Sequence, residues 1–329
     1  MNAYPGLTLC GTFRLLHLIG KGAMGSVWSA HHLVLDAPCA IKFLSKDGWQ
    51  LEDARTRFLQ EARTAARVDH PHVVRVLDYR VTEDREPFLV MELLRGETLE
   101  ERIQNAGPLR IDEVARIVEQ TAVALAASHG QGIVHRDVKA DNIFLTAGPA
   151  IAVKLLDFGV AESVTPGEQT SAKTLPFGTP YYMSPERLCQ QAGDERVDLW
   201  ALAITAYYSL TGVFPFEGKT LGSLCLSIAR GEFLPIRALR PDLPPALDAW
   251  FARALAVDPD TRFFSVDELR ETFCAITDAP RYAFSPAPTT LSQRSDLTAR
   301  ELRQRPLRAV RASVAALAMT LIGAWAVWG

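Results

Sequence analysis

The sequence predicts an α+β protein with two lobes, a small β-rich N-terminal lobe and a larger, mainly helical C-terminal lobe. Within residues 13–94 the apolar residues alternate with polar ones in short runs, a pattern that is typical of strands. Within residues 95–276 the apolar period lengthens to about 3.6, which indicates helices packed on one face. The 329 residues contain 48% hydrophobic side chains, enough for a substantial core.

The composition excludes several classes of protein. The 35 basic and 38 acidic side chains give a net charge of -3, so no basic excess indicates a nucleic-acid partner. The five cysteines are scattered without a C-x-x-C pair, which argues against a disulfide framework or a zinc site and favours a reducing, cytosolic compartment. Residues 1–12 form a short N-terminal extension without the pattern of a signal peptide.

A glycine-rich run follows the first predicted strand, residues 13–19. Glycines at this spacing let the backbone approach phosphate oxygens and donate N–H groups to them. The same spacing occurs in dinucleotide-binding folds and in ordinary hairpins. Residues 26–30 continue as a strand rather than opening a helix, and this favours a hairpin that lies over a nucleotide. The run comprises Gly20, Lys21, Gly22, Ala23, Met24, Gly25, Ser26 and Val27.

One lysine, Lys42, lies in the middle of the next predicted strand, residues 37–44. A buried lysine is costly unless an opposite charge neutralises it. The predicted helix over residues 52–68 places Glu61 beside its packed face, so we expect a Lys42–Glu61 ion pair. The alternative is that Glu61 is a solvated charge on that helix. Further strands are predicted over residues 73–77 and 87–91, and a hinge between the lobes over residues 92–96.

The C-terminal lobe is predicted to consist mainly of helices. Asp112 is expected to cap the start of a long helix that ends at Gly130 or Gly132. Residues 197–210 are apolar on nearly every side, as expected for a central buried helix. Ser265 begins a capping box that should open the last helix.

The stretch from Ile133 to Asn142, I-V-H-R-D-V-K-A-D-N, carries three different polar groups close together. Asp137 offers a carboxylate that can orient a hydroxyl, Lys139 an ammonium that can neutralise a phosphoryl oxygen, and Asn142 a carboxamide that can hold a metal. These are the groups that phosphoryl transfer to an alcohol requires. An isolated H-x-D would instead indicate a polar loop, so the assignment depends on the other motifs.

Residues 13–275 carry eight motifs in an order that resembles the Hanks-type protein kinases, and most of all the bacterial serine/threonine kinases. The motifs are G-x-G-x-x-G, A-I-K, a helix glutamate, H-R-D-x-K-x-x-N, D-F-G, G-T-P-Y-Y-M-S-P-E, D-L-W-A-L and D-P-x-x-R. Any one of them could occur by chance, whereas the ordered set is specific. The resemblance implies the bilobal protein kinase fold, with an N-lobe over residues 13–94 and a C-lobe over residues 95–276, and the ATP-dependent phosphorylation of protein hydroxyls.

The resemblance also implies the roles of individual residues. Asp137 would orient the substrate hydroxyl and accept its proton, and Lys139 would steady the γ-phosphoryl group. Asn142 and Asp157 would hold Mg²⁺, with Mn²⁺ as an alternative ion. The expected catalytic residues are Asp137, Lys139, Lys42, Glu61 and Thr179. The expected ATP contacts, besides the glycine-rich run and Lys42, are Ile19, Met91, Glu92, Leu94 and Glu97.

Regulation is expected in the loop that follows Asp157. In the family an arginine such as Arg136 commonly gathers a phosphorylated activation loop, since a guanidinium matches phosphate oxygens. We therefore expect autophosphorylation in this loop, the alternative being a solvated loop rich in serine and threonine. The expected phosphosites are Thr170, Ser171 and Thr174. The residues expected to make structural contacts are Glu186, paired with Arg262, and Asp198, next to the catalytic loop.

The composition changes after residue 276. Residues 277–311 are rich in proline, serine and threonine and then in arginine, which suits a flexible juxtamembrane linker. Residues 312–329 contain no charged side chain and would span about 27 Å as a helix, slightly less than a hydrocarbon core of about 30 Å. The arginines follow the positive-inside rule, so we expect a single-pass membrane anchor with the kinase domain in the cytoplasm. The alternative is a hydrophobic helix that packs on a partner or lies in the membrane interface.

Two classes of function stay open. The first is an ATP-dependent serine/threonine protein kinase that acts on protein substrates and on itself, without a nucleic-acid partner. The second is a pseudokinase or scaffold, in which one of Lys42, Asp137 and Asp157 would be missing, whereas all three are present. A small-molecule kinase fits less well, because G-T-P-Y-Y-M-S-P-E resembles a peptide-docking segment. Whether the chain dimerises is left open.

Overall fold

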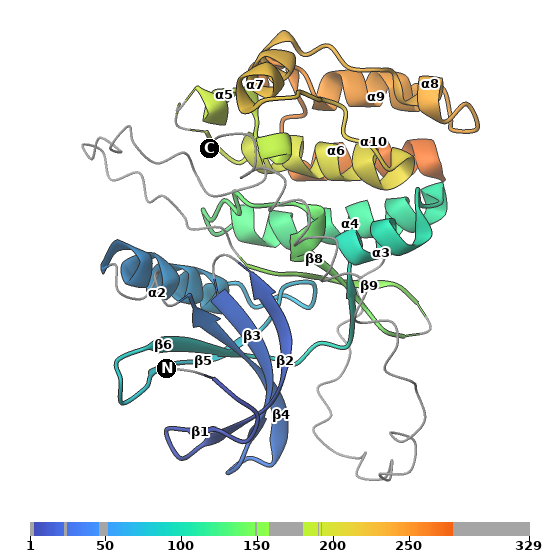
Figure 1. The fold of residues 1–329 in the computed structure, drawn as a ribbon. Helices are drawn as coiled ribbons and strands as arrows, with labels where there is room; N and C mark the ends of the chain where they lie inside the picture. The colour runs from blue at the N-terminus through green and yellow to red at the C-terminus, as the bar shows by residue number, and fades with distance from the viewer. Residues whose placement is uncertain are drawn as a thin grey trace, which may run out of the picture. The chain divides into compact units, whose positions relative to one another are not determined.

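The computed structural model of the chain describes residues 3–22, 25–45, 52–148, 150–157, 180–189, 191 and 193–278 (Figure 1). None of the helices in these residues has the length and apolar character needed to cross a bilayer. Several predicted features lie outside the described residues: Ala23, Met24, Thr170, Ser171, Thr174, Thr179 and the predicted anchor over residues 312–329.

The N-terminal lobe is built on an antiparallel sheet. Its strand order within the described residues is β1-β2-β3-β4-β6-β5. The strands are β1 (Thr8–Leu9), β2 (Phe13–Gly22), β3 (Gly25–His32), β4 (Ala37–Leu44), β5 (Val76–Val81) and β6 (Pro87–Met91). The predicted strands over residues 37–44 and 87–91 match β4 and β6. Both lie inside the sheet, where β6 buries all of its residues and β4 buries half, so their apolar patterns located them well.

The hairpin formed by β2 and β3 carries the glycine-rich run. Gly22 pairs with Gly25 across the turn. Gly25 has a φ of 152°, and a Cβ at this position would lie 1.8 Å from the carbonyl oxygen of Phe43 on β4. The packing of β3 on β4 therefore requires glycine at position 25.

The helix α2 (Glu52–Arg67) packs on this sheet through Phe58 and Ala62, which cluster with Leu89 of β6. Ala65, one turn after Glu61, is 6% exposed and belongs to the main core cluster. The helix predicted over residues 52–68 is confirmed to within one residue at its end. Because Phe58 and Ala62 face the sheet, the neighbouring Glu61 is brought toward the strands as well.

A second antiparallel sheet links the two lobes. Its strands are β7 (Gly96–Thr98), β8 (Ile143–Thr146) and β9 (Ala152–Leu155), in that order. Leu155 donates its N–H to the carbonyl oxygen of His72 at 2.7 Å and accepts the N–H of Val74 at 2.9 Å. The strand predicted from residue 73 is therefore wrong in its start, because residues 72–74 bond to β9 and β5 begins only at Val76.

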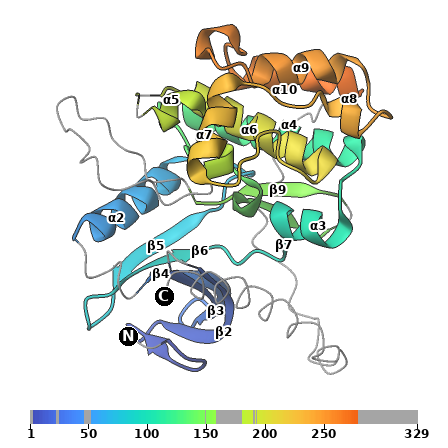
Figure 2. The same ribbon diagram turned by 45° about the horizontal axis from the view of Figure 1, so that its top comes forward.

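The C-terminal lobe consists mainly of helices around α6 (Arg196–Thr211), which is buried along nearly its whole length. The other helices of the described C-lobe are α3 (Leu99–Ala106), α4 (Ile111–His129), α5 (Pro185–Leu188), α7 (Leu221–Arg230), α8 (Ile236–Leu239), α9 (Ala246–Ala254) and α10 (Val266–Thr277). α6 packs against α4, α9 and α10 (Figure 2). The central buried helix predicted over residues 197–210 is confirmed, and Gly212 ends it with a φ of 74°.

The starts of two helices differ from the sequence-based expectation. Arg110, not Asp112, occupies the N-cap position of α4, and the Asp112 carboxylate instead accepts a bond from Arg110 Nε at 2.9 Å. At α10, the Ser265 hydroxyl accepts the N–H of Glu268 at 3.2 Å as predicted. The Glu268 carboxylate, however, accepts the N–H of Phe264 at 2.7 Å, so the reciprocal bond of the capping box goes one residue upstream.

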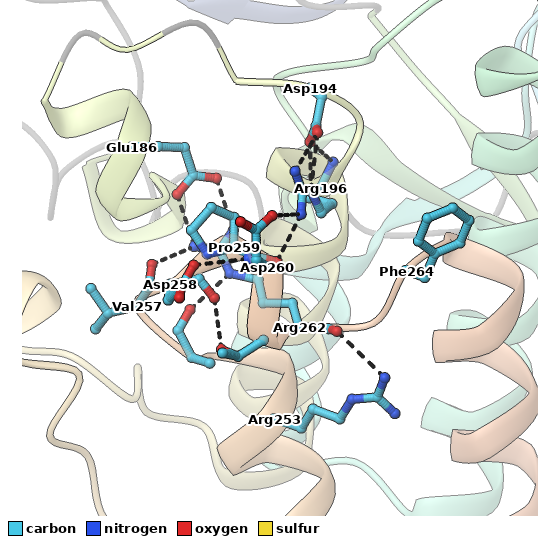
Figure 3. Close-up of polar contacts among 12 residues, drawn as sticks. Glu186, Asp194, Arg196, Arg253, Val257, Asp258, Pro259, Asp260, Arg262 and Phe264 are labelled. Atoms are coloured by element: carbon cyan, nitrogen blue, oxygen red, sulfur yellow. Dashed lines mark hydrogen bonds and ion pairs between the residues drawn. The ribbon is translucent and has the colours of Figure 1, made fainter.

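A buried ion pair fastens α5 to the loop before α10 (Figure 3). Arg262 donates from both Nη atoms to the carboxylate of Glu186, each at 2.8 Å. The side chain of Arg262 is 0% exposed, and its guanidinium carbon also lies 4.8 Å from the centroid of the Trp200 ring. Burial raises the pKa of Glu186, but the hydrogen bond and charge of Arg262 lower it by more. The Glu186–Arg262 pair predicted from the sequence is thus present.

Candidate active site

The loop between α4 and β8 is anchored on Asp198 of α6. The Asp198 carboxylate, which is 0% exposed, accepts the N–H of His135 at 2.8 Å and the N–H of Arg136 at 2.7 Å. His129 Nε2 lies 2.8 Å from the same carboxylate. Burial raises the pKa of Asp198, but the hydrogen bond and charge of His129 lower it by more, so the group is ionised at neutral pH. The predicted contact of Asp198 with this loop is confirmed.

Two side chains of the loop donate hydrogen bonds to Asp137. Lys139 Nζ donates to the two carboxylate oxygens of Asp137, at 3.0 and 2.8 Å. Asn142 Nδ2 donates to the backbone carbonyl and to Oδ2 of Asp137, both at 2.8 Å. The Asp137 side chain is 29% exposed, so its carboxylate is held in place and stays accessible to a hydroxyl group.

The lysine of β4 lies between two carboxylates. Lys42 Nζ is 2.8 Å from Glu61 on α2 and 2.7 Å from Asp157, which follows β9. Burial lowers the pKa of Lys42, but the charges of Asp157 and Glu61 raise it by more. Burial likewise raises the pKa of Asp157, but the charge and hydrogen bond of Lys42, together with nearby positive charge, lower it by more. The predicted Lys42–Glu61 pair is present, and Asp157 is a second partner that the sequence did not indicate.

The predicted metal ligands Asn142 and Asp157 lie on two segments that are hydrogen-bonded to each other. The Asn142 carbonyl accepts the N–H of Leu156 at 2.8 Å, and His135 Nε2 lies 2.9 Å from the Leu156 carbonyl oxygen. The described residues contain no group of three or more His, Cys, Asp or Glu side chains that would hold an ion. A site with two protein ligands fits Mg²⁺, which keeps several waters and binds substrate phosphates.

An apolar cluster joins strands of the N-terminal lobe to the segment that follows β9, close to these charged groups. Its buried members are Ala40, Val74 and Met91, and Val27, Leu93, Leu94 and Leu156 pack against them with partial exposure. Ala40 lies two residues before Lys42, and Leu156 directly precedes Asp157. An apolar surface beside charged groups that are expected to bind phosphates fits a flat ring such as adenine. Sequence reasoning missed Ala40, Val74 and Leu156, because their apolar pattern is the same as that of any core residue.

The β2–β3 hairpin leaves room at two of its glycines. A Cβ added at Gly20 or at Gly22 would meet no atom within 4 Å, so the packing of the fold does not require glycine at either position. Their missing side chains fit the close approach of a phosphate group to the backbone. Ile19, beside them, is 51% exposed, and Lys21 is exposed as well.

The family model of the protein kinase domain matches residues 13–268, well over half of the chain. The chain belongs to the protein kinase family. Serine/threonine-protein kinase pkn3 of Myxococcus xanthus is 35% identical over 296 residues, which cover 87% of this chain and 54% of that protein. Serine/threonine-protein kinase PknH of Mycobacterium bovis is 36% identical over 262 residues, which cover 80% of this chain and 43% of that protein. The chain thus spans about half the length of these relatives.

Solved kinase structures share the fold. The PknI kinase domain of Mycobacterium tuberculosis aligns with a TM-score of 0.68 at 28% identity, covering 84% of this chain and 100% of that chain. Rad53 1-466 in complex with AMP-PNP aligns with a TM-score of 0.63 at 27% identity, covering 79% of this chain and 64% of that chain. The predicted family, the bacterial serine/threonine kinases of the Hanks type, and the predicted bilobal fold are confirmed.

Two residues of the kinase that are predicted to contact ATP, Glu92 and Glu97, already pair with basic side chains of the protein. Glu92, after β6, accepts the N–H of Arg75 at 2.8 Å and a bond from Lys154 Nζ at 2.6 Å. Glu97 of β7 pairs with Arg102 Nε at 2.6 Å. Their charges are therefore neutralised within the protein, and the ATP contacts of Glu92 and Glu97 stay predictions.

Glu61 gives the kinase an expected pH dependence. Burial raises the pKa of Glu61 to about 6, although the charge of Lys42 lowers it. Glu61 is therefore ionised at neutral pH and takes up a proton as the pH falls through about 6, which removes its charge from Lys42. We expect the affinity for ATP to fall below that pH, measured by titration of the protein with a fluorescent ATP analogue between about pH 5 and pH 8.

Glu61→Gln removes the titrating group. This variant should bind the analogue weakly at every pH in the range and should lack the transition near pH 6. The matched control is Glu83→Gln, because Glu83 is exposed in the turn between β5 and β6. Glu83→Gln should keep the wild-type profile, and a transition retained in Glu61→Gln would assign it to another group.

Proposed function

We propose that the chain is an ATP-dependent serine/threonine protein kinase that transfers a γ-phosphoryl group to hydroxyls of proteins. The observation that carries the proposal is the arrangement of two charged centres, Asp137 fixed by two donors and Lys42 held between two carboxylates. Two further facts support it. The relatives are serine/threonine kinases, and the chain resembles a Rad53 structure that holds AMP-PNP.

Each charged group has a chemical task in this proposal. Asp137 orients the acceptor hydroxyl and takes its proton, for which its 29% exposure leaves access. Lys139 places a positive charge beside Asp137, where charge on the transferring group is to be neutralised. Lys42 would bind ATP phosphates, and Asn142 and Asp157 would bind Mg²⁺. When bound, ATP supplies the phosphoryl group and Mg²⁺ offsets its negative charge.

The second candidate is a scaffold that uses the same fold without catalysis. Loss of Lys42, Asp137 or Asp157 would favour it, and the chain retains all three. Each of the three also has an oppositely charged partner in the protein, so none of them is an isolated surface charge. We therefore favour the enzyme.

Replacing Asp137 by asparagine removes the proton acceptor and keeps the shape of the side chain. We expect Asp137→Asn to lower the rate of phosphoryl transfer by about 10² or more, because an amide accepts no proton at neutral pH. The measurement is transfer of labelled γ-phosphate from ATP with Mg²⁺ to a generic basic protein. Thermal unfolding, followed in parallel, should show that the variant stays folded.

The matched control for this substitution is Asp84→Asn. Asp84 is exposed in the turn between β5 and β6, so this variant should transfer phosphate at the wild-type rate. Full transfer by Asp137→Asn would overturn the assignment of the proton acceptor. Wild-type protein that binds ATP but transfers no phosphate would favour the scaffold.

We infer further that the kinase phosphorylates its own activation loop. Arg136, directly before Asp137, supplies a guanidinium that can bind phosphate oxygens with two bonds. The loop sequence offers hydroxyls at Thr170, Ser171 and Thr174. Phosphate on them would add the negative charge that such an arginine binds.

Mass spectrometry of peptides from the ATP-treated protein tests this inference. We expect phosphate on one or more of Thr170, Ser171 and Thr174, because phosphate on these hydroxyls would give the Arg136 guanidinium an anionic partner. Asp137→Asn, treated in the same way, should carry none. Phosphate found only outside this loop, or none in an active preparation, would contradict the inference.

We also infer that residues 312–329 hold the kinase at a membrane, with the kinase domain in the cytoplasm. The support is the sequence alone: this segment has no charged side chain, and arginines accumulate directly before it. Lipid would then be a partner of the chain beside its protein substrates.

Flotation of the full chain with phospholipid vesicles tests the anchor. The full chain should float, and a chain that ends at Asp278 should not. Arginine at both Met319 and Ile322 should abolish flotation, because each costs about 2.5–3.5 kcal/mol at the centre of a membrane helix. Thr320→Ser is the control that should float, and flotation of the double arginine variant would contradict a spanning helix.

A further inference from the structure

The residue before the predicted catalytic aspartate has a strained main chain. Arg136 has a φ of 64°, in the left-handed region that is unfavourable for a residue with a Cβ. Such a conformation persists only where the surrounding structure determines it. The N–H of Arg136 donates to Asp198 at 2.7 Å, which fixes one side of the residue.

The peptide group between Arg136 and Asp137 is held at both of its polar atoms. Its carbonyl oxygen, which belongs to Arg136, accepts a bond from Arg187 Nη1 at 2.5 Å. Its N–H, which belongs to Asp137, donates to His135 Nδ1 at 3.3 Å. The opposite ring nitrogen of His135 lies 2.9 Å from the Leu156 carbonyl oxygen, so one neutral tautomer of the ring satisfies both contacts.

This peptide group decides where the Asp137 carboxylate points. Because a peptide is planar, fixing its oxygen and its N–H fixes the direction in which the next Cα leaves it. Rotation of the plane would swing the Asp137 side chain away from Lys139 and Asn142. Of the groups that hold the plane, Arg187 carries a charge, and a charged donor makes the stronger hydrogen bond.

Arg187 is itself firmly placed. It belongs to α5, and the preceding residue, Glu186, is tied to Arg262 by two bonds of 2.8 Å (Figure 3). The next residue, Leu188, donates its N–H to the carbonyl of Ser184 at 3.1 Å, which keeps this short helix closed. The guanidinium of Arg187 therefore approaches the Arg136 carbonyl from a base that is anchored in the C-lobe core.

We propose that Arg187 is a positioning residue for the kinase reaction, which sets the orientation of Asp137 through the carbonyl oxygen of Arg136. The proposal rests on the proposed function, since it assigns Asp137 the role of proton acceptor. Arg187 also connects two segments. The first is the G-T-P-Y-Y-M-S-P-E motif, which resembles a peptide-docking element and ends within α5, and the second is the loop that contains Asp137. The alternative is that Arg187 merely ties α5 to the loop and contributes stability.

Replacement of Arg187 by methionine removes every donor and keeps most of the side-chain volume. We expect Arg187→Met to lower the single-turnover rate of phosphoryl transfer about tenfold to hundredfold, because a misplaced reacting group costs rate. The KM for ATP should stay within about twofold of wild type, because the nucleotide groups lie elsewhere. Arg187→Lys keeps a cation with one well-placed donor and should recover most of the lost rate.

Two comparisons separate positioning from a merely structural role. Combined with Asp137→Asn, Arg187→Met should cause no further loss, because a residue that acts through Asp137 has nothing left to position. The matched control is Arg240→Met, since Arg240 also donates to a backbone carbonyl, that of Leu210 at 2.7 Å. Leu210 lies at the C-terminal end of α6, whereas Asp198, which anchors the catalytic loop, lies in its first turn. Arg240→Met should therefore lower the melting temperature and leave the single-turnover rate unchanged.

The possible outcomes decide between positioning and stability. An Arg187→Met rate equal to that of Arg240→Met, a lysine variant no better than the methionine variant, or a further loss on the Asp137→Asn background would each overturn the role of Arg187. If Arg187→Met does not fold, Arg187→Lys against Arg187→Gln gives the same test, with the lysine variant expected to be faster. Wild-type protein with no more transfer than Asp137→Asn would instead overturn the proposed function, and the role of Arg187 with it.

Discussion

The buried carboxylate of Asp198 is the constraint on which the catalytic loop depends. A carboxylate taken fully out of water is costly unless hydrogen bonds satisfy its oxygens. Two backbone N–H groups of the loop and the His129 ring supply those bonds. The charge is therefore well accommodated only while the loop keeps its present conformation, including the left-handed main chain of Arg136. Because nearly all of α6 is buried, the loop is built on a rigid support.

Residues 155–157 connect this loop to the N-terminal lobe. Leu155 exchanges backbone bonds with residues 72–74, which precede β5. Leu156 donates to the carbonyl of Asn142 in the catalytic loop. Asp157 binds Lys42 of β4, which in turn binds Glu61 of α2. Since the consecutive residues Leu155, Leu156 and Asp157 bond to residues 72–74, to the catalytic loop and to β4, a shift of either lobe would move Asp157 and the predicted metal site with it.

The sequence predicted the features that local pattern and the cost of burying charge determine. β4 and β6 follow from their apolar runs, and the Lys42–Glu61 pair follows from the need to neutralise a buried lysine. It did not predict contacts that depend on long-range geometry, such as the bond of Lys42 to Asp157 or of Arg187 to the Arg136 carbonyl. Nor could it separate Ala40 and Val74 from the core, because an apolar residue beside a nucleotide looks like any other buried residue.

Exposure separates the charges that hold the fold from those that fit a ligand. The side chains of Asp198 and Arg262 are 0% exposed, and protein groups occupy their hydrogen-bonding positions. Asp137 and Asp157 are 29% and 40% exposed, although each is bound by a lysine. A fully buried carboxylate needs all of its hydrogen-bond partners within the protein. A partly exposed carboxylate can also accept bonds from a ligand or a metal ion. The same residue type, aspartate, therefore serves both purposes in this chain, and its surroundings rather than its sequence motif decide which.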